Sequence, residues 1–488
     1  MRIAVFFLFC GAVFAQDPGD TLTAADVTAA IQAAAASVNV STMAIAVTDR
    51  QGDILGVFSE PNMPAASTGN FSAQVSTTEL AIALARTASF FSNDQAPLSS
   101  RTVRFISGIH FPEGILYSSN GPLYGIENTN RGCPLNANFV PGQAIPAATL
   151  SDGVSFGLGP VTGKVDVYDS DQGAVNPGGV PLYKNGELAG GIGVAGVGSD
   201  IAEFAAYSGA SGAGFGAAPA APGVVIINGI ALPFVNQTTQ PAGTAPGAVN
   251  GSFVMGPVDS PGPAPDGDIV AAAAGPLGGL TQDQVQGIID AAVAAASQTR
   301  AVIRLPIGST ARMVFAVTDL DGTILALHRM PDATFFSIDV AVAKARNVVY
   351  FSGNTPDLPG IPANTAVTNR TIGFGGQPFF APGIDHTKPG PFFNLYENDV
   401  ANPCTQGSQP ATPNQSGIVF FPGSEPLYEN GVLVGGLGVS GDGVDQDDYV
   451  TSQAGAPFEA PASIRADQIV IRGVRMPFMS FPRNPTVQ

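Results

Sequence analysis

Few residues of this chain have the chemistry of a catalytic or metal-binding group. Only 12% of the 488 residues are charged, and the three histidines, His110, His328 and His386, are far apart in the sequence. No His-Glu-x-x-His motif or cysteine pair at zinc spacing is present, so no zinc site is predicted. A Gly-x-Ser-x-Gly elbow is also missing, and three unrelated histidines do not support a Ser-His-Asp triad. Whether the protein is an enzyme stays open, and a non-catalytic role is favoured.

Two other sequence patterns match known binding motifs, but their sequence context differs from that of the motifs. Segments 191–196 and 436–441 read Gly-x-Gly-x-x-Gly, but each follows an Asn-Gly turn instead of opening a βαβ unit. We interpret both as glycine-rich strands that a helix or a neighbouring chain approaches closely. The acidic segment 442–448 lacks the glycine and terminal glutamate of an EF-hand loop, so we interpret it as the start of a helix and not as a calcium site.

Composition excludes two classes of partner. Lys and Arg number 20 against 38 Asp and Glu, which gives a formal net charge of −18. Such a chain is a poor match for phosphate backbones or anionic membranes. The hydrophobic content of 45% and the length predict two or three folded domains.

The first residues predict export. Segment 1–15 has one arginine, a short apolar run and a small-residue cleavage site, as in a secretory signal peptide. The apolar run is too short to span a bilayer, and no later run reaches 18 apolar residues. We therefore expect a secreted or periplasmic protein without a membrane span.

The chain reads as a tandem duplication. Four segments recur in the same order, namely 43–49 as 313–319, 181–186 as 426–431, 190–196 as 435–441, and 229–234 as 473–478. The first repeat then covers 20–236 and the second covers 277–488. Between them, 237–276 is rich in Pro, Gly and Ala, which predicts an exposed linker.

Each repeat has the pattern of an α+β domain with one antiparallel sheet. A helix with a capping-box start at Thr23 or Thr281 precedes a β-hairpin, and a second helix follows at 78–88 or 338–350. A second hairpin turns at an Asn-Gly pair, which favours a type I′ turn. Long insertions, 90–180 and 352–417, separate the second helix from this hairpin, and their role is not predicted.

The two cysteines that remain after signal cleavage lie at matching places in the insertions. If the repeats pack about a pseudo-twofold axis, equivalent residues approach one another across it. We therefore predict a Cys133–Cys404 disulfide that links the repeats. The alternative is two free, buried thiols.

Taken together, these segments resemble the GlcG/HbpS-like haem-binding family. The second repeat carries the pattern best, in Val317–Leu325, Arg329-Met330, Ser337–Ala345 and Gly417–Asp447. The resemblance covers the core of each repeat and omits the insertions and the linker. It implies a compact, self-associating α+β domain, and haem or a similar tetrapyrrole as ligand. A tandem of two such domains would replace a homodimer with an internal pair.

The resemblance also suggests a ligand site in the second repeat. Two cations there would hold carboxylates such as haem propionates, two histidines are candidate iron ligands or pocket caps, and an acid and two glycines complete the site. These residues are Arg329, Lys344, His328, His386, Glu425, Gly435 and Gly436. The first repeat has Leu84 where the second has Lys344, so we expect it to act as scaffold.

Each of these residues also has an ordinary structural interpretation. His328 and His386 would be polar surface residues, and Lys344 would be a helix charge that faces solvent or pairs locally. Two hypotheses follow. The protein is an exported tandem module that binds haem or a similar anionic small molecule as carrier, sensor or scavenger, or it is an assembly protein without ligand chemistry.

Overall fold

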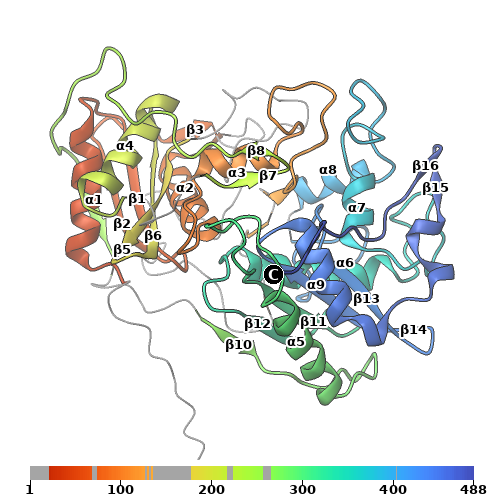
Figure 1. The fold of residues 1–488 in the computed structure, drawn as a ribbon. Coiled ribbons are helices and arrows are strands. Elements are labelled where there is room, and N and C mark those ends of the chain that lie inside the picture. The colour runs from red at the N-terminus through yellow and green to blue at the C-terminus, as the bar shows by residue number, and fades with distance from the viewer. Residues whose placement is uncertain are drawn as a thin grey trace, which may run out of the picture.

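The computed structural model describes residues 21–68, 74–126, 129–130, 133, 135, 177–216, 224–256, 265–402 and 404–487. The expected signal peptide therefore lies outside the described residues. We call residues 21–256 the first half and residues 265–487 the second half. Figure 1 shows the halves side by side, the first in red to yellow-green and the second in green to blue. Among the described residues, no helix is long and apolar enough to cross a membrane.

The first half contains a five-stranded antiparallel sheet and two smaller hairpins. Its helices are α1 (Ala24–Ser37), α2 (Thr77–Phe91), α3 (Ser100–Ser107) and α4 (Ser199–Gly212). The sheet strands are β1 (Ala44–Asp49), β2 (Ile54–Ser59), β5 (Gly179–Lys184), β6 (Glu187–Ala195) and β9 (Ser252–Met255). The smaller hairpins are β3 (Ala66–Thr68) with β4 (Gln74–Ser76), and β7 (Ile226–Ile227) with β8 (Ile230–Ala231).

The second half contains a sheet of the same kind. Its helices are α5 (Gln282–Ala296), α6 (Ser337–Phe351), α7 (Asn369–Gly375), α8 (Phe393–Ala401) and α9 (Val444–Ala454). The sheet strands are β10 (Gly267–Val270), β11 (Val314–Thr318), β12 (Ile324–Arg329), β13 (Ser424–Glu429) and β14 (Val432–Ser440). Three 3-10 turns, η6 (Ala456–Phe458), η7 (Ala462–Ile464) and η8 (Ala466–Gln468), precede a final hairpin of β15 (Val470–Ile471) and β16 (Val474–Arg475).

The two sheets have equivalent strand orders. The first runs β5-β6-β1-β2-β9 and the second runs β13-β14-β11-β12-β10. Registers also agree, since Pro181 pairs with Gly191 and Pro426 pairs with Gly436. The α+β class with antiparallel sheets is thereby confirmed. The segment expected to be an exposed linker supplies an edge strand to each sheet, β9 beside β2 and β10 beside β12.

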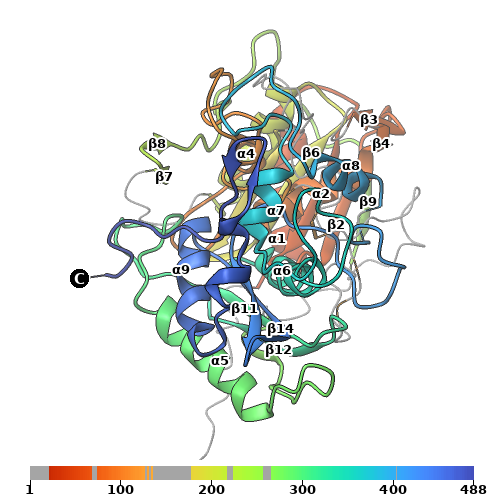
Figure 2. The same ribbon diagram turned by 90° about the vertical axis from the view of Figure 1, so that its right-hand side faces the viewer.

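Each sheet lies between two layers of helices. In the first half α2 covers one face, while α1 and α4 pack together on the other. In the second half α6 takes the place of α2, and α5 and α9, which lie next to each other in Figure 2, take the other face. The glycines of β14 allow a close approach, because a Cβ at Gly438 would lie only 2.0 Å from the carbonyl oxygen of Ala341 in α6.

Local sequence signals explain the helix starts and the turns. Thr23 and Thr281 form capping boxes at α1 and α5, as expected. Asn185, Gly186, Asn430 and Gly431 all have positive φ, as a type I′ turn requires. Helix α9 begins within the acidic segment 442–448, as expected, whereas α4 at the matching place in the first half was not among the predicted elements. In α4 small Ala, Gly and Ser residues give only a weak periodic pattern.

One hydrophobic cluster extends across the contact between the two halves, and the first half also has clusters of its own. The end of α2 meets the beginning of α6, where the Phe91 and Phe336 rings stack with centroids 4.1 Å apart. Phe90 packs against Phe335 in the same way at 5.0 Å. One cluster of buried side chains contains residues of both halves, including Leu98 and Val439. Contact between the halves is therefore part of the folded core.

The insertions also join the halves covalently. Cys133 and Cys404 form a disulfide with a Cα–Cα distance of 5.4 Å, so that prediction is confirmed. Nearby, the rings of Tyr124 and Tyr396 stack with centroids 5.0 Å apart. The described parts of the insertions thus connect the two halves.

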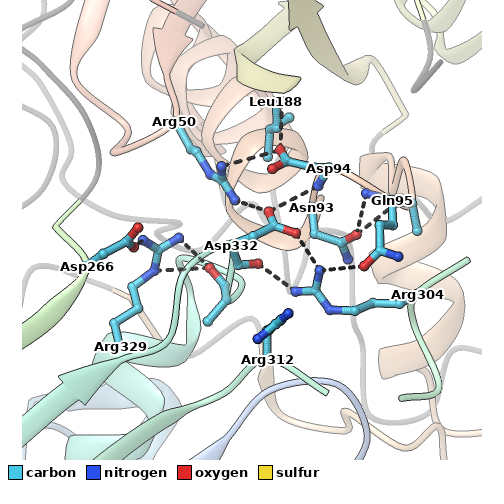
Figure 3. A network of polar contacts seen from close by, with 12 residues as sticks. Arg50, Asn93, Asp94, Gln95, Leu188, Asp266, Arg304, Arg312, Arg329 and Asp332 are labelled. Atoms are coloured by element: carbon cyan, nitrogen blue, oxygen red, sulfur yellow. Dashed lines mark hydrogen bonds and ion pairs between the residues drawn. The ribbon is translucent and has the colours of Figure 1, made fainter. Parts of the chain in front are cut away.

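A network of charged side chains lies where the halves meet (Figure 3). Asp332 accepts hydrogen bonds from Arg50 of the first half and from Arg304 of the second. Arg304 also contacts Asp442, and Arg50 also contacts Asp94 at 3.4 Å. Burial alone would raise the pKa of Asp332, but Arg50 and Arg304 lower it to about 2. The network therefore holds Asp332 ionised between two guanidinium groups.

Candidate functional site

A cavity of ≈ 440 Å³ lies between the two halves, and we call it the interface pocket. Its walls combine apolar side chains with several polar ones and come from distant segments. The apolar residues include Leu98, Ile106 and Leu123 from the first half and Val302 and Phe421 from the second. A volume in this range and walls of this kind are typical of small-molecule sites. The interface pocket is the strongest candidate site among the described residues.

One wall of the interface pocket carries a buried ion pair. Lys344 Nζ, on α6, donates to Asp447 Oδ2 at 2.9 Å and to the carbonyl oxygen of Val439 at 2.8 Å. It also lies 5.0 Å from the ring centroid of Phe421. Asp447 Oδ1 has no hydrogen-bond partner among the described residues, although it is buried. Asp447 lines the pocket, so its carboxyl group is the buried acid nearest to a ligand bound there.

The Asp447 carboxyl titrates close to neutral pH. Burial raises its pKa to about 7, against the lowering effect of Lys344. Burial also lowers the pKa of Lys344. Asp447 can therefore accept a hydrogen bond when it is ionised and donate one when it is protonated. A carboxyl with such a pKa is also suited to proton transfer.

The first half builds the same junction from apolar side chains. Gly423 faces Val439, Asp447 and Lys344, whereas Gly178 at the matching turn faces Val194 and Ala202. In the sequence register of the repeats, Leu84 and Ala202 stand where the second half has Lys344 and Asp447. By contrast, the pair of Arg101 with Glu203 is retained as Arg370 with Asp448. The fold therefore does not need a charged pair at the pocket wall.

Arg329 does not join Lys344 in a ligand site. Its guanidinium is 1% exposed and donates to the carbonyl oxygen of Ala333 and to the carboxylate of Asp266. Burial lowers the pKa of Arg329 to about 10. Neither Arg329 nor Asp266 lines the interface pocket. The expectation that Arg329 and Lys344 together hold a carboxylate ligand has no support from these contacts.

The two histidines of the predicted site also lie elsewhere. His328 Nδ1 contacts Asp268 of the neighbouring edge strand β10 at 2.7 Å, and its ring stacks on Phe315. His386 is exposed in the second insertion, with the rings of Phe379 and Tyr117 at 6.5 and 6.4 Å. Neither histidine lines the interface pocket. A site that combines them with Lys344 is not formed.

The other predicted residues have separate positions. Gly435 and Gly436 lie in β14, where an added Cβ at Gly436 would be 2.3 Å from the carbonyl oxygen of Ala345, which leaves no room for a ligand. Glu425 is buried in β13 and lines a second cavity of ≈ 600 Å³ near the C-terminus. The predicted set is therefore distributed over the wall of the interface pocket, the second cavity, the protein core and the exposed surface.

The acids of segment 442–448 form ion pairs within the fold. Asp442 binds Arg304, while Asp445 and Asp448 bind Arg370. Among the residues that the structure describes, no group of three or more His, Cys, Asp or Glu side chains is placed to hold a metal ion. The acids at the start of α9 are therefore committed to ion pairs.

Most of the pocket residues carried no signal in the sequence. Leu98, Ile106 and Leu123 lie in or beside the first insertion, and Ile226 and Asn228 belong to the small β7–β8 hairpin. Isolated apolar residues of this kind look like any core or loop position. A difference between the two halves could have indicated Asp447, since Leu84 and Ala202 stand where the second half has Lys344 and Asp447.

Comparison with known proteins identifies the second half. The sequence model for the family described as "Haem degrading protein HbpS-like" matches residues 280–456. This segment belongs to the HbpS-like family. It includes α5, α6, both hairpins of the second sheet and α9. No curated protein matches the chain.

Two solved structures are similar to part of the chain. One is the crystal structure of a PduOC:heme complex, with 23% identity over 37% of this chain and 94% of that chain and a TM-score of 0.24. The other is the Klebsiella pneumoniae protein ORFY of the family DUF336, with 21% identity over 37% of this chain and 90% of that chain and a TM-score of 0.25.

Proposed function

We propose that the protein binds a flat, largely apolar small molecule in the interface pocket, and that a tetrapyrrole such as haem is its ligand. The Lys344–Asp447 pair carries this proposal. It places a buried carboxyl group on the wall of the cavity, and the first half shows that the fold can be built without this pair. The HbpS-like family of residues 280–456 supports the choice of ligand class.

The lining residues suit a tetrapyrrole ring better than its iron. Leu98, Ile106 and Phe421 offer apolar surfaces to a planar ring, and the exposed Arg483 is the cation among the described lining residues that can meet a carboxylate. No His, Cys, Met or Tyr is among the described residues that line the pocket. The pocket therefore supplies no usual axial ligand, and we assign affinity to the ring and its carboxylates.

This assignment favours a carrier or scavenger over an enzyme that acts through the iron. The test is a titration of the purified protein with haemin and, separately, with iron-free protoporphyrin IX, followed by absorbance and by quenching of porphyrin fluorescence. We expect saturation near one ligand per chain. The dissociation constants of haemin and of the iron-free ring should agree within about tenfold. Binding of haemin without measurable binding of the iron-free ring would contradict the assignment.

We further propose that the two halves arose by duplication and that the second half retains the ligand chemistry. The matching strand orders and the matched Arg101–Glu203 and Arg370–Asp448 pairs support a common origin. Leu84 and Ala202 support a scaffold role for the first half. The protein is also proposed to be exported, because a disulfide persists in oxidising compartments. N-terminal sequencing of the natural product should then find Gln16 as the first residue.

Self-association without ligand chemistry is the second candidate function. An exposed apolar patch supports it, formed by Ile115, Leu116 and Tyr117 with exposures of 54–62% and by Ile384 at 51%. The two loops that carry this patch are joined by the hydrogen bond from the Tyr117 backbone N–H to Asp385. Light scattering of wild type and of Leu116→Glu tests it. A wild-type multimer that Leu116→Glu disrupts would favour assembly through this patch. Monomers in both wild type and variant would exclude the patch as an assembly surface.

A further inference from the structure

The second cavity is built wholly from the second half, and we call it the C-terminal pocket. It has a volume of ≈ 600 Å³ and lies between β13, the end of α9 and the C-terminal segment 476–481. Met476, Phe478 and Met479 give it apolar walls. It adjoins the interface pocket, since Phe481 lines both cavities.

A buried carboxyl group without a partner lines this cavity. Glu425 is 3% exposed, and its Oε1 has no hydrogen-bond partner among the described residues. An added Cβ at Gly455, which caps the C-terminus of α9, would lie 1.4 Å from this oxygen. The carboxyl group thus lies against a helix C-terminus, whose partial negative charge disfavours an anion.

The surroundings of Glu425 favour its protonated form. Burial raises its pKa well above the usual range, and Glu459 and Asp448 raise it further, whereas Arg465 lowers it. Both arginines of the cavity are already paired. Arg465 contacts Glu459 at 2.7 Å and Asp467 at 3.6 Å, and Arg475 contacts Asp467 at 3.6 Å. Nε of Arg465 also lacks a hydrogen bond, but its guanidinium is neutralised by these acids, whereas Glu425 has no ion pair among the described residues. The acid is therefore the charge that a ligand can still balance, which favours a cationic ligand over an anionic one.

We propose that the C-terminal pocket binds a small organic cation, an alkylamine or alkylguanidine, whose N–H group donates to the carboxyl group of Glu425. The alkyl part lies against Met476 and Met479. On binding, the protonated Glu425 loses its proton to solvent and pairs as a carboxylate with the cation, so one proton is released for each ligand bound. The first half has the apolar Val180 at the position of Glu425 in the strand register, so the fold does not require an acid there.

Isothermal titration calorimetry of the full protein with n-hexylammonium tests the proposal. The titration is made at pH 6 in two buffers of different ionisation enthalpy, which gives the number of protons released. Wild type should release close to one proton per bound amine. Neutral n-hexanol should bind at least tenfold more weakly than the amine. Glu425→Val, which copies the first half, and the isosteric Glu425→Gln should both weaken amine binding at least tenfold and abolish proton release.

Three results would overturn it, namely no amine binding by wild type, equal binding by both variants, or binding without proton release. Haemin binding provides an independent readout, because Glu425 does not line the interface pocket. Glu425→Val should leave haemin binding unchanged. Failure of the amine proposal can therefore be distinguished from failure of the tetrapyrrole proposal.

Discussion

At the residue scale, the two halves provide their own control for the Lys344–Asp447 pair. Exchanging a buried ion pair for packed apolar residues is commonly neutral or stabilising, whereas removing one partner leaves an uncompensated charge. We expect Lys344→Leu/Asp447→Ala, which copies Leu84 and Ala202, to unfold at a free energy equal to or above that of wild type. Lys344→Leu alone should lose about 3–5 kcal/mol at pH 8. Denaturant unfolding measures both free energies. Equal losses in the single and the double variant would contradict the interpretation that the fold does not need this ion pair.

Asp332 predicts how stability depends on pH. Its folded pKa of about 2 lies below the usual 3.8, so its contribution is present above pH 3.8 and is lost as pH falls towards 2. Asp332→Asn, which copies Asn62 of the first half, should lower the unfolding free energy by about 2 kcal/mol at pH 7. The difference from wild type should shrink near pH 2. A constant difference across this range, measured by urea unfolding, would show that Asp332 does not act through its charge.

Residue types in the predicted site could be read from the sequence, but their partners could not. Lys344 lies at the candidate site, yet it pairs with Asp447, 103 residues away. Arg329 pairs with Asp266, 63 residues away in the segment expected to be a linker. Whether a cation faces a ligand or an internal acid depends on which distant segments fold against it, and local patterns do not contain that information.

At the element scale, the glycines of β14 are required by the approach of α6. Gly438→Ala would place a Cβ 2.0 Å from the backbone oxygen of Ala341, and backbone on both sides cannot yield cheaply. We expect a loss of about 1–3 kcal/mol or more. Gly287→Ala in α5 is the matched control, since no atom lies within 4 Å of the added Cβ, and it should gain up to about 1 kcal/mol. Thermal unfolding of both variants measures these changes in stability. Similar losses in Gly438→Ala and Gly287→Ala would contradict the explanation by close approach of α6.

Local signals predicted the elements where local physics determines them. Capping boxes at Thr23 and Thr281 and the Asn-Gly turns are encoded within a few residues, and all appear in the structure. The strands β9 and β10 were missed because their pairing depends on the sheets that they join. Their sequence, between Pro- and Gly-rich residues, gives no reason to expect a strand.

At the scale of the whole molecule, the disulfide restrains the two halves. Cys133 and Cys404 are separated by 271 residues, so the closed loop covers more than half of the chain. Long loops give the largest restriction of the unfolded state. Replacing both cysteines with serine should lower the unfolding free energy by about 2–5 kcal/mol in non-reducing buffer. Reductant should lower the unfolding free energy of wild type to that of the variant. A difference in unfolding free energy that persists under reduction would show that the disulfide is not its cause.

The interface pocket is a property of the whole molecule and could not be predicted from either repeat. Its walls combine the first insertion, the β7–β8 hairpin and the start of α9, which are brought together only when the halves pack. The sequence did indicate that the two halves would pair. It did not indicate that a cavity lies between them.

The most direct measurement is a titration with haemin after the interface pocket has been filled. Val302→Trp places a large side chain in the cavity, whereas Val293→Trp changes a similarly half-buried valine of α5 outside the pocket. If the pocket holds the ligand, Val302→Trp should weaken haemin binding at least tenfold, and Val293→Trp should bind like wild type. Unchanged binding by a folded Val302→Trp protein would contradict the assignment of the ligand to this pocket.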